Sequence, residues 1–246
     1  MNDSNESVPD DAMTAMVFLD FDGTLTCRDA TDAILETYAH PDWRQIEEEW
    51  TNGRIGSREC LTRQMALVTA TPREIDVLLD TIEVDAGLVP LLEICRAHHL
   101  PVHIVSDGFD RCIYRILRRE ALNLGASLAA IPVFSSHLEQ RSGQWRVRFS
   151  APVVTCEHGC GTCKPFIMNT LNPTARPTIF VGDGLSDRFA ATCADLVFAK
   201  GALGDYCDQH TIPRRPYESL ATVAGDLDRL VRSSAMNRRT CCRAGA

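Results

Sequence analysis

Short apolar runs alternate with helix-like segments over most of the chain. Apolar runs of three to five residues predict strands that are buried on both faces, as in a parallel sheet. The predicted strands are residues 15–19, 101–105, 131–134, 177–181 and 196–198. The predicted helices between them are residues 88–98, 110–122, 164–171 and 188–193. This alternation predicts an α/β fold, a parallel sheet with helices on both faces.

The region between the first two predicted strands has a different rhythm. Leu61, Met65 and Val68 recur at helical spacing, and Pro72 is typical of a helix start. We therefore expect a mostly helical insert there. The predicted division is residues 1–14 as a disordered N-terminus, 15–28 and 85–232 as the core, 29–84 as the helical insert and 233–246 as a flexible tail.

A hairpin is predicted in the second half of the chain, over residues 137–149. Trp145 and Val147 alternate with polar residues, as expected for a strand with one buried face. Ser142 and Gly143 precede this alternation and supply the turn.

Composition and charge exclude some classes of protein. The chain has 246 residues, 45% hydrophobic and 24% charged, which suits one globular unit with an insert. Its net charge of −8 disfavours binding to a nucleic-acid backbone. The apolar runs are shorter than the roughly 18 residues of a membrane span. The N-terminus is acidic and unlike a signal peptide, so we expect a cytoplasmic protein.

The 11 cysteines are an odd number in a chain that is not small, so a full disulfide framework is not expected. Four potential ligands lie close together, namely Cys156, His158, Cys160 and Cys163. The preferred interpretation is a tight loop that shapes the approach to Lys164. A zinc site and a redox role remain open, because the spacing is not that of a standard zinc finger.

Polar residues follow three of the predicted strands. They are Asp20, Asp22, Ser106, Asp107, Asp183 and Asp187. In an open parallel sheet, sites form at the carboxyl ends of the strands, so these residues should converge. Several carboxylates close together would repel one another unless a cation lies among them, and hard oxygen ligands suit Mg²⁺.

Chemistry on a phosphate also needs positive donors for its oxygens. Lys164 and the hydroxyl of Ser106 are the candidates, and Lys164 opens a predicted helix after a glycine-rich loop. Main-chain N–H groups beside Gly23 and Gly108 could complete the cradle, because glycine lets the backbone approach a ligand closely. Taken singly, each carboxylate could instead be a turn or cap residue.

Four segments in series resemble the haloacid dehalogenase superfamily of phosphatases. They are Asp20-Phe21-Asp22-Gly23-Thr24 after the first strand, Val105-Ser106-Asp107-Gly108, Lys164 at a helix start, and Gly182-Asp183-Gly184-Leu185-Ser186-Asp187. The resemblance covers about residues 17–207. It implies a Rossmann-like core with a parallel sheet, and it implies that the helical insert is a C1 cap.

The resemblance also implies a role for each matching residue. Asp20 would attack phosphorus and form an aspartyl-phosphate, and Asp22 would be the general acid and base. The remaining implied roles are phosphate binding by Ser106, Asp107, Gly108 and Lys164, and Mg²⁺ binding by Asp20, Asp183, Asp187 and the backbone carbonyl of Asp22.

The substrate is implied only as a small phosphorylated metabolite. The chain resembles the IB branch of the superfamily, which includes phosphoserine phosphatases and phosphoethanolamine/phosphocholine phosphatases. The segments at 104–110, 160–164 and 181–200 lean toward the methionine-salvage phosphatases of that branch. Phosphoserine hydrolysis, phosphoryl transfer to a second substrate and non-catalytic binding stay open, as does the oligomeric state. The candidate cap residues are Arg28, Asp29, Asp32, Arg44, Glu47, Trp50, Arg54 and Arg63.

Overall fold

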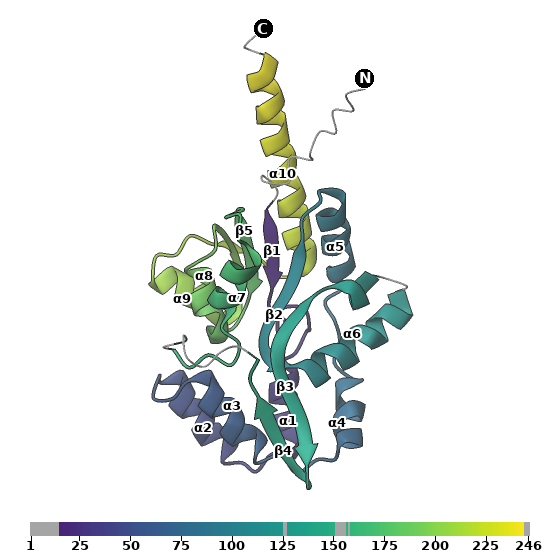
Figure 1. Cartoon of the computed structure of the whole chain (residues 1–246), viewed down its shortest axis with the longest axis vertical. Helices are drawn as coiled ribbons and strands as arrows, with labels where there is room; N and C mark the ends of the chain where they lie inside the picture. The colour runs from purple at the N-terminus through teal and green to yellow at the C-terminus, as the bar shows by residue number, and fades with distance from the viewer. Residues whose placement is uncertain (1–14, 125–126, 151–155, 157, 244–246) are drawn as a thin grey trace, which may run out of the picture.

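A seven-stranded sheet forms the centre of the protein (Figure 1). The computed structural model describes residues 15–124, 127–150, 156 and 158–243. Its strand order is β4-β3-β2-β1-β5-β6-β7, and only β3 and β4 pair antiparallel. The strands are β1 (Met16–Leu19), β2 (Val102–Phe109), β3 (Val133–Arg141), β4 (Gln144–Arg148), β5 (Thr178–Gly182), β6 (Leu196–Ala199) and β7 (Arg215–Pro216). The prediction of a mostly parallel α/β sheet is confirmed.

Helices cover both faces of the sheet, because alternate residues of each central strand point to opposite sides. In β1, Val17 and Leu19 belong to one core, whereas Met16 and Phe18 belong to another. The first core contains α5 (Leu88–Ala97), α6 (Asp110–Leu124) and α10 (Leu220–Arg243). The second contains α7 (Lys164–Leu171), α8 (Arg188–Ala191) and α9 (Gly201–Gln209).

Four helices lie beyond the carboxyl ends of the parallel strands, at the lower end of Figure 1. They are α1 (Ala30–Tyr38), α2 (Trp43–Thr51), α3 (Ser57–Met65) and α4 (Pro72–Leu79). Helix α1 begins after Asp29, whose carboxylate accepts from the Asp32 N–H at 2.9 Å. A bridge between Thr26 and Val84 joins the two connections of this segment to the core. The boundaries 29–84 for the insert stay a prediction.

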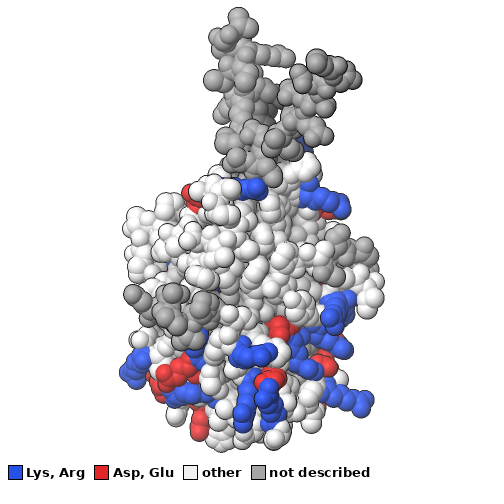
Figure 2. Space-filling view, viewed as in Figure 1, with Lys and Arg blue, Asp and Glu red and all other residues white. Residues whose placement is uncertain are grey.

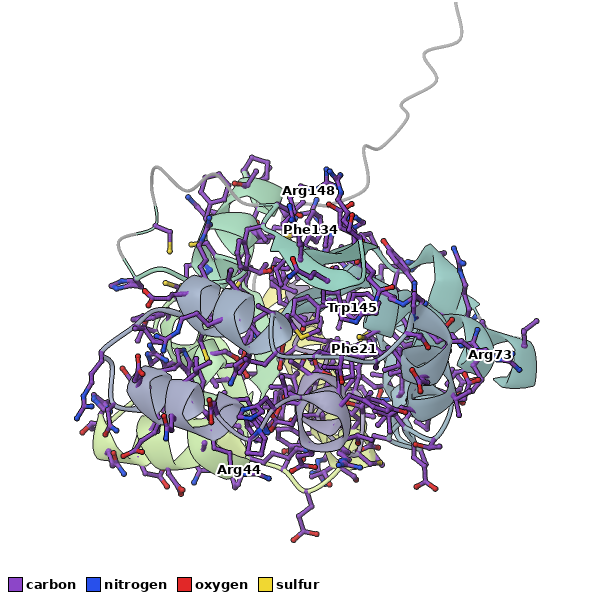
Figure 3. All side chains as sticks on the ribbon, turned by 90° about the horizontal axis from the view of Figure 1, so that it is seen from below. Phe21, Arg44, Arg73, Phe134, Trp145 and Arg148 are labelled. Atoms are coloured by element: carbon purple, nitrogen blue, oxygen red, sulfur yellow. The ribbon has the colours of Figure 1, made fainter. Side chains whose placement is uncertain are left out.

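The β3–β4 hairpin extends the sheet and packs against the helical segment. Ser142 and Gly143 have φ of 51° and 80°, as a two-residue type I′ turn requires. The sequence predicted two strands, at 131–134 and from 137, whereas the structure has one strand, β3. The buried Trp145 donates to the Ala70 carbonyl at 2.8 Å, which anchors the hairpin to the helical segment. In Figure 3, Trp145 and Phe21 lie toward the middle of the molecule and Arg73 toward its edge.

Three elements after β6 were not predicted. Helix α9 buries only Leu203, Gly204 and Cys207, too few apolar residues for a clear helical period. The sequence predicted β6 as the last strand, but the structure has one more, β7, at the edge of the sheet. β7 ends in Pro216, a residue suited to an edge strand. Helix α10 continues through residues 233–243, where no periodicity was found. The expected disordered N-terminus, residues 1–14, lies outside the described residues.

Charged side chains gather at the lower end of the face in Figure 2, with both signs interleaved. Two ion pairs there join α4 to α6, Arg111 with Asp76 at 2.6 Å and Arg115 with Asp80 at 2.5 Å. Solvent screens surface pairs of this kind, so they orient α4 more than they stabilise it. Within the described part of the chain, each helix is too short or too polar to span a bilayer.

Candidate active site

The predicted site residues meet at the carboxyl edge of the sheet. Asp20 follows β1 directly, and Asp183 follows β5. Since β1 lies between β2 and β5, the ends of these three strands are neighbours. Lys164 opens α7 and points into the same region, although it lies 144 residues from Asp20 in the sequence. The tertiary fold therefore brings together four segments that the sequence could only order.

A buried lysine joins two of the aspartates. Lys164 Nζ donates to Asp20 Oδ1 at 2.6 Å and also to Asp187 Oδ1. The exposed fraction of the Lys164 side chain is 1%, and that of Asp187 is 0%. Burial alone would lower the pKa of Lys164, but Asp187 and Asp20 outweigh it and raise the pKa above its ordinary value. Lys164 is therefore a fixed positive charge beside Asp20.

The two aspartates after β5 are held in different ways. Asp187 Oδ2 accepts from the main-chain N–H groups of Asp183 and Gly184, at 3.1 and 3.2 Å. Because Lys164 donates to the other oxygen, both carboxylate oxygens of Asp187 already accept hydrogen bonds that hold the loop and Lys164 in place. Asp183 Oδ1 accepts from the Thr24 hydroxyl at 2.6 Å. The contacts of the described residues leave Oδ2 of Asp183 free for a ligand.

The carboxylates of Asp20, Asp183 and Asp187 lie close together, and those of Asp20 and Asp183 each keep an oxygen that can face a cation. Each offers an oxygen within 4.8 Å of the others. Burial and the Asp187 carboxylate raise the pKa of Asp20 despite the opposing effect of Lys164, and the same two causes raise the pKa of Asp183 to about 6. A cluster of crowded carboxylates with one lysine lacks positive charge at neutral pH. The donor set is all oxygen, so the residues fit Mg²⁺.

Asp22 lies apart from this cluster. Its Oδ1 accepts from the Ala30 N–H at 2.8 Å, at the first turn of α1. Burial, followed by the nearby Asp29 carboxylate, raises its pKa. Gly108 is necessary here, because a Cβ at that position would overlap the Asp22 carboxylate. The sequence predicted the backbone carbonyl of Asp22 as a metal ligand. The Asp22 side chain is therefore not needed for metal binding and can serve in proton transfer.

Ser106, Asp107 and Gly108 form one wall of the site. The sequence predicted a strand that stops before Ser106, but β2 continues to Phe109, with a shift in its pairing to β3. The Ser106 hydroxyl accepts from the Gly108 N–H at 3.0 Å. Asp107 accepts from the Thr162 N–H at 2.7 Å. Asp107 therefore holds the loop before Lys164, a contact that the sequence did not predict.

Tyr217 is a residue that the sequence analysis missed. Its hydroxyl lies 3.5 Å from the Thr24 hydroxyl and 3.3 Å from the Gly182 carbonyl, and 4% of the residue is exposed. It supports Thr24, which in turn holds Asp183. Tyr217 follows the two-residue strand β7, and an isolated tyrosine there gives no periodic signal.

A pocket of about 410 Å³ opens in front of these residues and separates the sheet from the helical segment. Of the candidate cap residues, Asp29, Asp32, Glu47 and Trp50 line it, whereas the four arginines do not. Among the described residues that line it, none is basic and three from the helical segment are acidic. The lining residues that sequence reasoning missed are Thr31, Thr51, Ser57, Cys60, Leu61, Gln64, Gly201 and Ala202.

The acidic side chains that the helical segment contributes to the pocket, Asp29, Asp32 and Glu47, make the stability of the protein depend on pH. Burial and Asp32 raise the pKa of Asp29 to about 7, and burial and Glu47 raise the pKa of Asp32 to about 6, both from an ordinary value of 3.8. Between pH 3.8 and 7 the folded chain therefore binds more protons than the unfolded chain. Stability gained from these protons is lost as the pH rises through the folded pKa values.

Without divalent cations, we expect the free energy of unfolding to fall by about 1–2 kcal/mol from about pH 5.5 to about pH 8. Asp29→Asn should reduce this fall, because Asn caps a helix as well as Asp but does not titrate. Urea unfolding at both pH values measures the difference. The exposed Asp205→Asn is the matched control. An unchanged pH dependence in Asp29→Asn would contradict the assignment.

Residues 17–192 match the haloacid dehalogenase-like hydrolases, a match that spans more than half of the chain. The chain belongs to this family. The predictions of this family and of a hydrolase are confirmed. The structure places the four segments on which the resemblance rested around one pocket, with Asp20, Ser106 and Asp183 lining it and Lys164 bonded to Asp20.

Relatives of this haloacid dehalogenase-family chain include named phosphatases. A protein of Exiguobacterium sp. named 2-hydroxy-3-keto-5-methylthiopentenyl-1-phosphate phosphatase is 28% identical over 215 residues, which cover 86% of this chain and 96% of that protein. A protein of Geobacillus kaustophilus with the same name is 29% identical over 223 residues, 87% of this chain and 96% of that protein. Both agree with the prediction of a phosphatase.

Solved structures share the fold of this haloacid dehalogenase-family chain. A phosphoserine phosphatase from T. onnurineus has a TM-score of 0.65 at 13% identity, covering 90% of this chain and 98% of that one. A structure described as a phospho-aspartyl intermediate analogue of phosphoserine phosphatase has a TM-score of 0.57 at 20% identity, with coverage of 79% and 91%. At these identities the likeness concerns the fold.

Proposed function

We propose that this hydrolase is a Mg²⁺-dependent phosphatase that acts on a small phosphorylated metabolite in the cytoplasm. The observation that carries the proposal is the contact between Lys164 and Asp20 at the floor of the acidic pocket. It combines a carboxylate nucleophile with a fixed positive charge that can bind a phosphoryl oxygen. Helices α1 to α4 would act as the cap that closes over the substrate.

Asp20 is the proposed nucleophile. Lys164 bonds to Asp20 Oδ1, and the described contacts leave Oδ2 without a hydrogen-bond partner. Attack on phosphorus would form an aspartyl-phosphate and break the bond to the leaving oxygen. Lys164 and the Ser106 hydroxyl would bind the phosphoryl oxygens, and the N–H of Gly108, which donates to the Ser106 hydroxyl, would help to orient it. Their positive and polar character would stabilise the charge of the transition state.

Asp22 is the proposed general acid and base. Its raised pKa favours the protonated form that must donate to the leaving oxygen. After the product departs, the same carboxylate can take a proton from the water that hydrolyses the aspartyl-phosphate. The Ala30 N–H bonded to Oδ1 would fix the carboxyl group in position. Closure by α1 would therefore be coupled to the orientation of the proton donor.

Mg²⁺ would be held by Asp20, Asp183 and the backbone carbonyl of Asp22, with Asp187 positioning the loop and Lys164. When bound, it supplies positive charge that offsets the repulsion between the carboxylates and the phosphate. The role of Asp187 follows from its contacts, since both of its oxygens already accept hydrogen bonds from Lys164 or the main chain.

Removal of one metal ligand tests this assignment. Asp183→Asn should raise the Mg²⁺ concentration needed for half-maximal activity by about 10- to 100-fold, because a neutral amide is a weaker ligand. A Mg²⁺ titration of phosphate release measures it, with Asp205→Asn as the exposed control. EDTA should abolish activity in the unmodified protein, and added Mg²⁺ should restore it. Activity that survives EDTA would contradict the metal assignment.

The pocket favours a leaving group without a carboxylate. Asp29, Asp32 and Glu47 line it and would repel an anionic amino acid, and the described lining offers no basic partner. Trp50 and Leu61 add apolar surface. We therefore propose 2-hydroxy-3-keto-5-methylthiopentenyl-1-phosphate, the substrate named for the relatives, ahead of phosphoserine. Apart from its phosphate this molecule carries no charge, and its methylthio group suits the apolar surface.

A phosphorylated amine is the second candidate. Carboxylates with an aromatic ring are suited to an ammonium group, and Glu47, Asp32 and Trp50 offer this combination in the pocket. Glu47 is held in place, because its Oε2 accepts from Gln64 at 2.8 Å. Glu47→Gln removes the charge with little change of shape. It should weaken hydrolysis of phosphoethanolamine and leave that of the uncharged substrate nearly unchanged.

A substrate panel with saturating Mg²⁺ separates the candidates. For the methylthiopentenyl phosphate, kcat/KM should exceed that for phosphoserine by at least about 100-fold, since a misplaced carboxylate leaves an unpaired charge. A preference for phosphoethanolamine that Glu47→Gln abolishes would select the amine instead. A preference for phosphoserine would refute the specificity argument. Release of no phosphate from any monoester would refute the proposed phosphatase.

A further inference from the structure

Three cysteines form a cluster just before Lys164 in the chain. The Sγ atoms of Cys156, Cys160 and Cys163 lie within 4.8 Å of one another. Cys160 is 7% exposed, and the other two are half-buried. None of the nine described cysteines, these included, is in a disulfide. The proposed catalytic residues do not include this cluster, so it needs an explanation of its own.

The main chain folds around the first sulfur. The N–H of Cys160 donates to Cys156 Sγ at 3.4 Å, and the N–H of His158 also donates to it. Gly159 allows this tight turn with a φ of +62°. A sulfur surrounded by N–H donors is prepared to carry negative charge.

The spacing of the sulfurs suits one small ion. A Zn–S bond of about 2.3 Å in tetrahedral geometry places sulfurs roughly 3.8 Å apart. The three sulfurs need to approach by at most about 1 Å to reach this arrangement, which a change in side-chain torsion provides. His158 is not the fourth ligand, because its ring nitrogens do not lie within 4.8 Å of all three sulfurs and its ring stacks on Phe189. The partly exposed Cys156 and Cys163 leave the fourth position to water.

We propose that Cys156, Cys160 and Cys163 bind one Zn²⁺ as three thiolates, with water as the fourth ligand. Each thiol that binds gives its proton to the solvent. The site is separate from the proposed Mg²⁺ site, since soft sulfur ligands select zinc and hard oxygen ligands select magnesium. This inference does not depend on the proposed substrate or reaction.

The position of the cluster gives the ion a structural role. Cys163 directly precedes Lys164 at the start of α7. The Cys160 carbonyl accepts from Arg58 Nε of α3 at 2.7 Å, and the Thr162 N–H donates to Asp107 at 2.7 Å. The loop therefore contacts α3, β2 and α7 at once. Zinc would hold this junction in the shape that places Lys164 beside Asp20.

Metal analysis of protein purified without an affinity tag tests the proposal. We expect about one zinc per chain after equilibration with Zn²⁺ and removal of the free metal. Cys156→Ser and Cys163→Ser should each lose most of it. Cys193→Ser, an exposed cysteine outside the cluster, should retain it. His158→Ala should also retain it, whereas its loss there would overturn the three-thiolate assignment. Less than about 0.1 zinc per unmodified chain would overturn the site.

Cobalt provides a readout that does not depend on the folding of a variant. Co²⁺ added to the metal-free, reduced protein should give a thiolate-to-cobalt charge-transfer band and the intense visible bands of a tetrahedral site. Added Zn²⁺ should abolish both, and added Mg²⁺ should not. A spectrum of octahedral cobalt, or a disulfide among these cysteines in freshly purified protein by mass analysis, would overturn the proposal.

Discussion

Asp20→Asn is expected to lower turnover by at least about 10⁴-fold and to leave the protein folded. The amide cannot form the covalent intermediate, so nothing replaces the lost nucleophile. Asn has almost the shape of Asp, and Lys164 keeps its second partner, Asp187. Removal of the charge also relieves the cost of burial and the repulsion by Asp187, which together raise the pKa of Asp20. A loss of activity without unfolding is the signature of a nucleophile.

Phosphate release under saturating Mg²⁺ measures this loss, and circular dichroism with thermal unfolding checks the fold. Asp208→Asn, which removes an exposed carboxylate paired with Arg214, is the matched control and should change activity less than about twofold. Turnover by Asp20→Asn within about 10-fold of the unmodified protein would be incompatible with nucleophilic attack by Asp20.

Asp22→Asn is expected to slow an alkyl phosphomonoester by about 10²–10⁴-fold, because the alkoxide then leaves without a proton. For p-nitrophenyl phosphate the leaving group needs no proton, so transfer to Asp20 should remain fast. Hydrolysis of the aspartyl-phosphate, however, would still lack its base. The variant should therefore release a burst of nitrophenolate close to one per chain and then turn over slowly.

Rapid-mixing absorbance measurements detect the burst, and acid quenching followed by intact mass analysis detects the phosphorylated chain. Ala30 and Gly108 enclose the Asp22 carboxylate, and Asn fits the same space. Asp208→Asn again serves as control. An equal loss on both substrates, without a burst, would assign Asp22 to binding or folding instead of proton transfer.

The two predictions rest on residues that the sequence identified in different ways. Asp20 and Asp22 follow an apolar run, and that pattern alone places them at the end of a buried strand. Lys164 was marked by its place at a helix start after a glycine-rich loop and by its position in the series of four segments. The structure gives it two carboxylate partners, and its burial shows that it is not a solvated lysine.

Helices and strands in which apolar residues recur at a regular spacing were predicted well, and those without such a spacing were not. Residues 164–171 were expected as a helix and form α7 within the same bounds. Helix α9 and the strand β7 were missed, because few residues in each are buried. β7 matters for the site, since Tyr217 follows it and supports Thr24. A contact of this kind depends on the neighbour that the fold provides and has no counterpart in local sequence.

The sequence by itself determined the fold class, the places of the central strands along the chain and the chemistry at their ends. These depend on local periodicity and on residue type, which the chain carries without reference to distant partners. Only the tertiary structure decided that both oxygens of Asp187 accept hydrogen bonds, that three carboxylates of the helical segment line the pocket and that the three sulfurs converge. Each is a matter of distance and burial, which the packing of the whole chain sets.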